Sequence, residues 1–423
     1  MEGDGAERIS PIDAATLGIS VHGGQPYLIT LAGVLGPGDL VDAEGRPDVP
    51  RLRALLAERI PALPALTHRP VRRDDGWWWE PHRPDLARHV RVEEPEHEHE
   101  PEHGHRGFEA VCASLLMRRL PPDRPLWEIV LVPRARPGGC GIVIRFHHVI
   151  ADGAHAVALV EQLFDPCTEP AEATDAPEPG SASTPTAIRP TRAAVLRHRI
   201  GQFVRPWVRS RVLLGPLGPR RDTAGASVDL ERLRRGAHAA GGRIGDAFLA
   251  AVGQGLALAT EAGGQRVPPT ITVSQPVRLA ASDGQLNSVG VMLVPVPLRG
   301  TMPDAVARVA RRTRDAKPVA RAAGTVIRSP AVARGFDRFA RHQHLIAAVV
   351  SNVPGPRGRL ALGGAPLVEL LPLGPLAGNV RIGVTAASYD GRFWIGVVTD
   401  ADHVIPARAI AHRIAGALDE LPD

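Results

Sequence analysis

Two adjacent histidines, His147 and His148, precede an aspartate and a glycine, Asp152 and Gly153, with three residues between the two pairs. A neutral imidazole is well suited to take a proton from a hydroxyl or an amine, because its unperturbed pKa lies close to neutral pH. The preceding residues 141–146 are mostly apolar and predict a strand, on which successive side chains point to opposite faces. Only one of the two histidines can therefore face a cleft, as a general base at a strand end.

A turn and a helix are expected after the histidines. Asp152 and Gly153 are typical of a helix N-cap, and apolar residues follow at helical spacing over residues 154–164, namely Val157, Val160, Leu163 and Phe164. Taken alone, this segment also fits a purely structural role, with one buried histidine, one surface histidine and Asp152 as an ordinary cap. Both interpretations stay open at this level.

The His-His-x-x-x-Asp-Gly pattern after a short apolar strand resembles the signature of acyltransferases related to chloramphenicol acetyltransferase. These include the condensation domains of peptide synthetases and the bacterial wax ester synthase/diacylglycerol acyltransferase family. Further runs resemble motifs of the latter family in its order along the chain: Ser-Pro-x-Asp at 10–13, Pro-Leu-Trp-Glu at 125–128, Asn-Val-Pro-Gly-Pro at 352–356, Ser-Tyr-Asp-Gly at 388–391 and Phe-Trp-Ile-Gly at 393–396. Together they span nearly the whole chain.

The resemblance implies an α/β fold with mixed sheets, in which two chloramphenicol acetyltransferase-like domains form a pseudo-dimer around a central tunnel. A thioester would reach the catalytic histidine from one end of that tunnel and the acceptor from the other. The second histidine of the family motif matches His148, which would act as the general base, with His147 and Asp152 completing the motif. The co-substrate implied is acyl-CoA, and neither a metal nor another cofactor is needed.

Other motif residues are expected to bind substrate or to support the site. The resemblance gives Asp152 a mainly architectural role, paired with an arginine, and Arg278 is the best-placed candidate. Asn352 or a nearby backbone amide would steady the tetrahedral oxyanion. Gly153 belongs to the same elbow.

Trp127 and Glu128 precede an apolar run at residues 129–132, which predicts a strand. A direct chemical role is one interpretation of this pair. A core position for Trp127 and a solvated strand end for Glu128 is the other.

The chain has 423 residues, long enough for two or three domains. Residues 166–190 are rich in Pro, Ala, Thr, Glu and Ser and hold almost no large apolar side chain, which is typical of an exposed linker. We therefore expect an N-terminal domain at 1–165, a linker at 166–191 and a C-terminal domain at 192–423. Hydrophobic periodicity predicts strands at 25–32, 270–275, 289–296 and 393–399, and helices at 51–60, 108–119, 246–260 and 303–315.

Composition favours a cytoplasmic protein. The three cysteines, Cys112, Cys140 and Cys167, have neither metal nor redox spacing, as expected in a reducing compartment. We find no secretory signal and no apolar run long enough for a membrane span. Four histidines within the acidic run 93–105 fit no closed zinc site, so an irregular acidic loop is the preferred interpretation.

Residues 189–221 contain nine arginines and no acidic residue, interleaved with apolar side chains such as Phe203, Trp207 and Leu213. This pattern suits peripheral contact with an anionic membrane or lipid droplet, or the phosphates of acyl-CoA. A solvated connector is the alternative. Pro206 predicts two short helices rather than one. With aromatic residues at 4% of the chain and no nucleic-acid fold signature, a nucleic-acid partner is not expected.

Three functions of different classes follow. The first is acyl-CoA-dependent O-acyl transfer to a long-chain alcohol or diacylglycerol. The second is a soluble condensation-type acyltransferase of secondary metabolism, which uses a CoA or carrier-protein thioester and a polar hydroxyl or amine acceptor. The third is a non-catalytic binding relative, against which the intact His148 and Asp152 argue. Two departures from the family pattern, Gly245 for a common Asn and Leu286 for a common Gly, concern the acceptor side.

Overall fold

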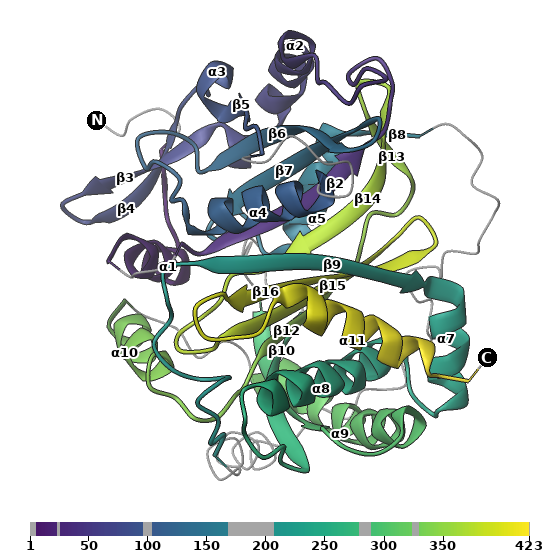
Figure 1. The fold of residues 1–423 in the computed structure, drawn as a ribbon. Coiled ribbons are helices and arrows are strands. Elements are labelled where there is room, and N and C mark those ends of the chain that lie inside the picture. Colours follow the sequence, from purple (N-terminus) through teal and green to yellow (C-terminus); the bar gives the residue numbers. More distant parts are fainter. Residues whose placement is uncertain are drawn as a thin grey trace.

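The described residues form two large mixed β-sheets and one small sheet, and several helices pack against the large sheets (Figure 1). The computed structural model describes residues 6–22, 26–95, 104–167, 207–278, 289–323 and 330–422. The predicted α/β class with mixed sheets is confirmed within these residues. The proposed linker, residues 166–191, lies almost entirely outside them.

The first sheet has seven strands, in spatial order β5 (Val90–Val92), β6 (Trp127–Arg136), β7 (Gly139–His147), β2 (Leu28–Leu35), β14 (Ala365–Leu373), β13 (Leu360–Leu362) and β8 (Asp165–Pro166). The second sheet has six strands, in order β11 (Val289–Pro297), β10 (Thr270–Arg278), β12 (Val349–Val353), β15 (Ile382–Tyr389), β16 (Arg392–Asp400) and β9 (Arg221–Asp229). A three-stranded sheet comprises β1 (Glu7–Arg8), β4 (Gly76–Pro81) and β3 (His68–Arg73).

The helices are α1 (Pro11–His22), α2 (Val49–Arg59), α3 (Leu86–His89), α4 (Gly104–Met117), α5 (Gly153–Leu163), α7 (Leu230–Ala239), α8 (Ile244–Ala262), α9 (Met302–Ala323), α10 (Pro330–Ala340) and α11 (Ala407–Asp419), with 3₁₀ turns η1 (Ile60–Ala62) and η2 (Pro64–Leu66). The Ser-Pro-x-Asp motif starts α1 as a capping pair. Ser10 Oγ donates to Asp13 Oδ2 at 2.7 Å, and Asp13 N donates back to Ser10 Oγ at 3.2 Å.

Strand alternation gives the first sheet two apolar faces. Ile129 and Ile144 share a core with α2 and α5, whereas Val130 and Val143 share another with α4. Because both faces are covered, β7 is buried along its whole length. The orientation of the strand therefore determines which histidine at its end enters the core.

The two halves of the sequence are interlocked. Strands β13 and β14, from the second half, complete the first sheet beside β2 and β8, as Figure 1 shows in yellow-green. Tyr389 at the end of β15 joins the sheets, since its hydroxyl donates to Leu367 O at 2.8 Å and accepts from Leu360 N at 3.0 Å. Thus residues 360–373 lie in the sheet of the N-terminal half, although the sequence grouped them with the domain at 192–423.

The described part of the arginine-rich segment, residues 207–221, consists of turns and irregular chain up to Arg221, the first residue of β9. The second of the two predicted short helices is therefore absent from these residues. Val208 and Leu213 are buried in the hydrophobic core of the six-stranded sheet. The glycines and prolines at 215, 216, 218 and 219 interrupt any helix that would follow. The remainder, residues 189–206, lies outside the described part of the chain.

Candidate active site

The histidine elbow joins β7 to α5. His147 is the last residue of β7 and pairs with Leu28 of β2. Asp152 is the N-cap of α5: its Oδ1 accepts from Ala154 N at 3.0 Å and from His155 N at 2.9 Å, and it lies 2.9 Å from His155 Nδ1. The expected cap is therefore present, and it fixes the chain between the strand and the helix.

His147 belongs to the protein core. Its side chain is only 5% exposed, and its Nδ1 accepts a hydrogen bond from Val149 N at 3.2 Å. Burial lowers the pKa of His147 to about 3, and the charge of neighbouring His148 acts in the same direction. His147 is therefore neutral near physiological pH, with the proton on Nε2, and it supports the elbow.

His148 follows the strand and is partly exposed. Its backbone N–H donates to Tyr27 O at 2.9 Å, which fixes the residue beside the start of β2. One histidine is buried and the other reaches the surface, as strand alternation predicts. Of the pair, His148 is the one that a substrate hydroxyl can approach.

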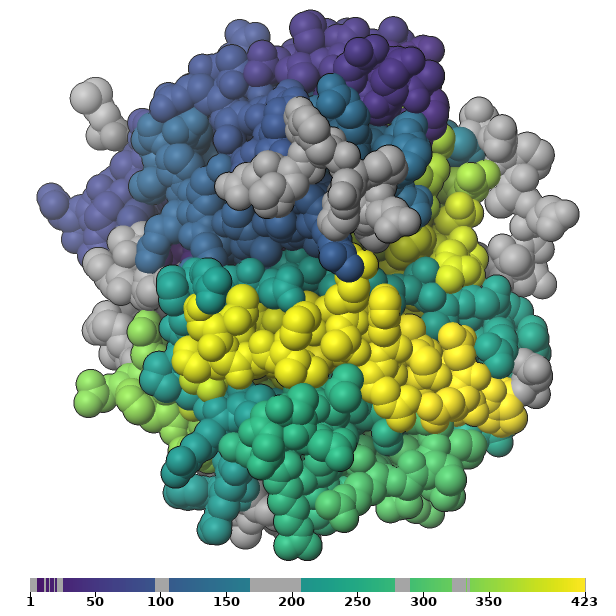
Figure 2. Space-filling model, viewed as in Figure 1, coloured from purple at the N-terminus to yellow at the C-terminus, as the bar shows by residue number. Residues whose placement is uncertain are grey.

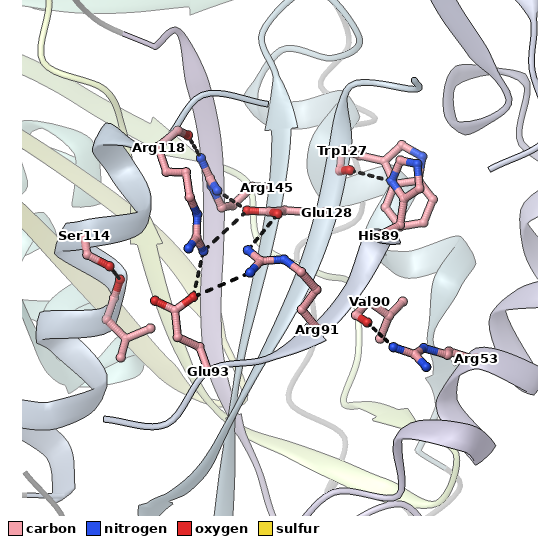
Figure 3. Close-up of polar contacts among 11 residues, drawn as sticks. Arg53, His89, Val90, Arg91, Glu93, Ser114, Arg118, Trp127, Glu128 and Arg145 are labelled. Atoms are coloured by element: carbon pink, nitrogen blue, oxygen red, sulfur yellow. Dashed lines mark hydrogen bonds and ion pairs between the residues drawn. The ribbon is translucent and has the colours of Figure 1, made fainter. Parts of the chain in front are cut away.

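Trp127 occupies a fully buried position at the start of β6. Its Nε1 donates to Leu66 O at 2.9 Å, and its ring stacks on His89 with centroids 4.3 Å apart (Figure 3). Burial lowers the pKa of His89, whose Nδ1 donates to Trp127 O at 2.8 Å. The interpretation of Trp127 as a core aromatic is confirmed.

Glu128 is buried, so the expectation of a solvated strand end is wrong. It lies directly opposite Arg145 on β7, and the two side chains form an ion pair. Arg145 is fully buried and also donates to Arg118 O, while Arg91 contacts the other oxygen of Glu128 at 3.0 Å (Figure 3). Although burial raises the pKa of Glu128, the charges of Arg145 and Arg91 lower it below its usual value.

This ion pair stands next to the elbow, because Arg145 is two residues before His147 and shares its face of β7. Burial lowers the pKa of Arg145 to about 10, so the side chain stays charged at neutral pH. Glu128 and Arg145 thus join β6 to β7, the strand that ends at His147, and their contacts are structural.

The elbow of the first half packs on β12 of the second half. A Cβ built on Gly153 would lie 3.0 Å from Val353 Cγ2, so the glycine permits this close approach. Asn352 precedes Val353 and is exposed, and a Cβ at Gly245 would lie 3.6 Å from its Nδ2. The structure therefore brings Gly153, Asn352 and the departure at Gly245 to one junction, while Leu286 lies outside the described residues.

Arg278 ends β10, which runs parallel to β12 from the pair Ser274–Val349. Its backbone therefore lies at the same sheet end as Val353. The Arg278 side chain is outside the described part of the structure, and the ion pair with Asp152 stays a prediction.

Tyr27 is a residue near the site that the sequence did not single out. Burial raises the pKa of Tyr27 to about 12, Asp337 adds to this shift and Arg341 opposes it. Both charged residues belong to α10 or follow it, so α10 lies near the elbow. The rarity of tyrosine, which occurs only twice in the sequence, could have drawn attention to Tyr27. The other tyrosine, Tyr389, joins the two halves through its hydroxyl.

Among the described residues there is no group of three or more His, Cys, Asp or Glu side chains arranged to hold a metal ion. Residues 96–103 of the histidine-rich run lie outside this description. No helix in the described ranges is both long and apolar enough to cross a membrane.

The Asn-Val-Pro-Gly-Pro block also has a packing function. A Cβ on Gly355 would lie 1.6 Å from Ser388 O, so only glycine allows this contact between the block and the Ser-Tyr-Asp-Gly motif. Asp390 and Gly391 have positive φ values of 47° and 69°, which form the turn between β15 and β16. Two of the family-like motifs thus meet in space.

Sequence comparison matches the catalytic domain of the wax ester synthase/diacylglycerol acyltransferase family over residues 10–205 and the C-terminal domain of that family over residues 286–422. A relative named as a probable diacylglycerol O-acyltransferase, tgs1 of Mycobacterium tuberculosis, is 27% identical over 373 residues, covering 80% of this chain and 79% of the relative.

Solved structures give the same fold. The wax ester synthase/diacylglycerol acyltransferase from Marinobacter aquaeolei VT8 aligns with a TM-score of 0.72 at 19% identity, over 98% of both chains. The first condensation domain of the CDA synthetase aligns with a TM-score of 0.65 at 15% identity, over 99% of this chain and 98% of that one. The elbow, the interlocked sheets and these matches together show that the chain is an acyltransferase belonging to the wax ester synthase/diacylglycerol acyltransferase family.

Proposed function

We propose that this protein transfers a fatty acyl group from acyl-CoA to a hydroxyl acceptor, a long-chain alcohol or a diacylglycerol, with His148 as the general base. The observation that carries the proposal is the different burial of the two histidines at the elbow. His147 is neutral and held by Val149 N, whereas His148 is partly exposed at the end of β7.

In this mechanism His148 accepts the proton of the acceptor hydroxyl while the oxygen attacks the thioester carbonyl. The tetrahedral intermediate then expels the CoA thiolate, which takes the proton back from His148. An ester and CoA are formed, and no acyl-enzyme is required. Asn352 is the candidate donor to the oxyanion, because it is exposed near the end of β12, the strand that packs on the elbow.

A small apolar pocket of about 20 Å³ lies next to helix α5. It lies between α5 and the strands β2, β7 and β14, and its lining includes Leu31, Ile144, Val160, Phe164 and Leu367. Ile144 is on the strand that ends at His147, so the pocket runs along the elements that hold the elbow. Although the lining is apolar, a volume of about 20 Å³ is too small for a fatty acyl chain, which could enter only if these side chains moved apart.

An acceptor panel tests the proposed function. Purified protein is given palmitoyl-CoA with hexadecanol, dipalmitoylglycerol, a short polar alcohol or an amino acid amide, and products are identified by mass spectrometry. We expect wax ester or triacylglycerol. Products formed only with the polar acceptors, or only from a carrier-protein thioester, would establish the condensation-type alternative instead.

A further inference from the structure

Helix α10 exposes aromatic side chains that neither core uses. Phe336 and Phe339 are 45% and 44% exposed, and their ring centroids lie 6.4 Å apart. Residues three apart share one face of a helix, so the two rings form one apolar surface. Exposed apolar clusters of this kind mark contact sites for lipids or proteins.

Trp207, from another part of the sequence, lies beside the chain that follows α10. It is 65% exposed, and its ring lies parallel to that of His344, with centroids 5.7 Å apart. Val208 N donates to His344 O at 2.7 Å. This bond holds Trp207 beside His344, which is four residues after the last residue of α10. Tryptophan and phenylalanine together are typical of surfaces that enter a lipid headgroup region.

Exposed arginines occur in both segments, next in sequence to the aromatic residues. Arg209, Arg211 and Arg338 are exposed and have no acidic partner among the described residues. Arg341, by contrast, pairs with Asp337 at 2.9 Å. Unpaired arginines beside apolar rings complement an anionic lipid surface, whereas a second copy of the same surface would repel them.

The position of α10 relates this surface to the active site. The helix packs on α1 at the left margin of the molecule in Figure 1, and its segment forms part of that margin in the space-filling view (Figure 2). Its Asp337 lies close enough to Tyr27 to affect the pKa of that hydroxyl, and Tyr27 O accepts from His148 N. A lipid surface on α10 would therefore lie near the elbow.

We propose that the α10 surface, made of Phe336, Phe339, Trp207 and the arginines Arg209, Arg211 and Arg338, docks the enzyme on an anionic lipid surface. Docking would bring membrane-held acceptors to His148. This second step rests on the proposed function, whereas the docking itself does not.

Vesicle co-sedimentation tests the apolar part. The full chain is mixed with vesicles of phosphatidylcholine alone or with added phosphatidylglycerol, and Phe336→Ser/Phe339→Ser is compared with Val92→Ser. Val92 is 41% exposed on β5, far from α10 in Figure 1, and is the matched control. We expect the double variant to bind the anionic vesicles about tenfold or more weakly at an unchanged Tm, with Val92→Ser binding like the wild type.

A second pair of variants tests the charge. Replacing Arg209, Arg211 and Arg338 with glutamine should weaken binding to the anionic vesicles by ~10-fold to 100-fold at low salt. Arg311→Gln/Arg314→Gln, on exposed positions of α9, should change it little. Equal binding to both vesicle types, or equal loss in the controls, would overturn the proposal.

Fluorescence quenching avoids reliance on the phenylalanine variants. Brominated lipids in anionic vesicles should quench a component of the tryptophan emission that is missing in Trp207→Phe. Absence of that component would overturn docking through this surface. Transfer to a soluble short-chain alcohol is measured in parallel. If the proposed acyl transfer is wrong, neither the wild type nor any variant will acylate an acceptor, whereas failed docking leaves transfer to the soluble alcohol intact.

Discussion

Burial makes the two adjacent histidines chemically different. His147 is buried and accepts from Val149 N, so it holds a fixed tautomer. His148 directly follows the last residue of β7. Because successive side chains alternate in direction along a strand, its side chain points away from that of His147 and is partly exposed. Their sequence positions predicted this division, but only the structure determined which residue is buried.

His147 should make stability depend on pH. Its folded pKa of about 3 is below the ordinary value of 6.5, so the unfolded chain binds the proton first as pH falls. Its contribution is complete above about pH 6.5 and is lost toward pH 3, by up to about 1.4 kcal/mol per pH unit.

Urea unfolding of wild type and His147→Asn across this pH range measures the effect. Asparagine can still accept from Val149 N, and it does not titrate. We expect a shallower fall in the free energy of unfolding for the variant below about pH 6.5. Identical slopes would mean that His147 is not buried as a neutral group.

Asp152 can be tested by separating its cap from its charge. Asparagine retains the oxygen that accepts from Ala154 N and His155 N, whereas alanine removes it. We expect Asp152→Ala to lower stability by about 1 kcal/mol and Asp152→Asn to lower it less. A loss of ~3–5 kcal/mol in Asp152→Asn would instead support the ion pair with Arg278.

At the scale of elements, the β6–β7 pair carries the buried charges. Arg145 is enclosed completely, so loss of its partner leaves an uncompensated charge in the core. Glu128→Gln should therefore lower the free energy of unfolding by ~3–5 kcal/mol.

Glu80→Gln is the matched control. Glu80 pairs with Arg69 at 2.7 Å, but both side chains are about one-third exposed. Exposed pairs contribute little, so this variant should unfold almost like the wild type. Thermal unfolding compares the two, and similar losses in both would show that the Glu128–Arg145 pair is effectively solvated.

Elements with strong periodicity were predictable. The strand before the histidines and the helices at α2, α5 and α8 agree with expectation within a few residues. Helix α9 continues past its predicted end at 315 and includes Pro318. Strand β9 was not expected because nearly all its residues are small or polar, with Val228 as its one large apolar residue, and it exists through pairing with β16. The burial of Glu128 was missed because its partner lies on a neighbouring strand, 17 residues away.

At the scale of the molecule, the halves share both strands and polar contacts. Glu109 of α4 accepts from Gly225 N of β9 at 3.0 Å and pairs with Arg408 of α11 at 2.6 Å. Thr223 Oγ1 also donates to Glu109 O at 2.7 Å. Such long-range pairing cannot be read from local periodicity, so the composition of the chain predicted two contiguous domains instead.

A fragment of residues 1–167 should therefore fail to fold. Without β14 the edge of β2 is unpaired, and the apolar face shared with β14 is exposed. We expect an aggregating or unfolded fragment by circular dichroism and sedimentation, with restoration of soluble protein when residues 168–423 are co-expressed. A stable monomeric fragment with native spectra would contradict the interlocked arrangement.

Direct measurement of acyl transfer tests the central claim that His148 activates the acceptor hydroxyl. Ester formation and CoA release are followed together with palmitoyl-CoA and hexadecanol for wild type, His148→Ala and His147→Asn. The wild type should form both products in equal amounts. We predict that His148→Ala loses ~10²-fold to 10⁴-fold or more in rate at an unchanged Tm, and that His147→Asn loses less. Turnover by His148→Ala at the wild-type rate would contradict the mechanism.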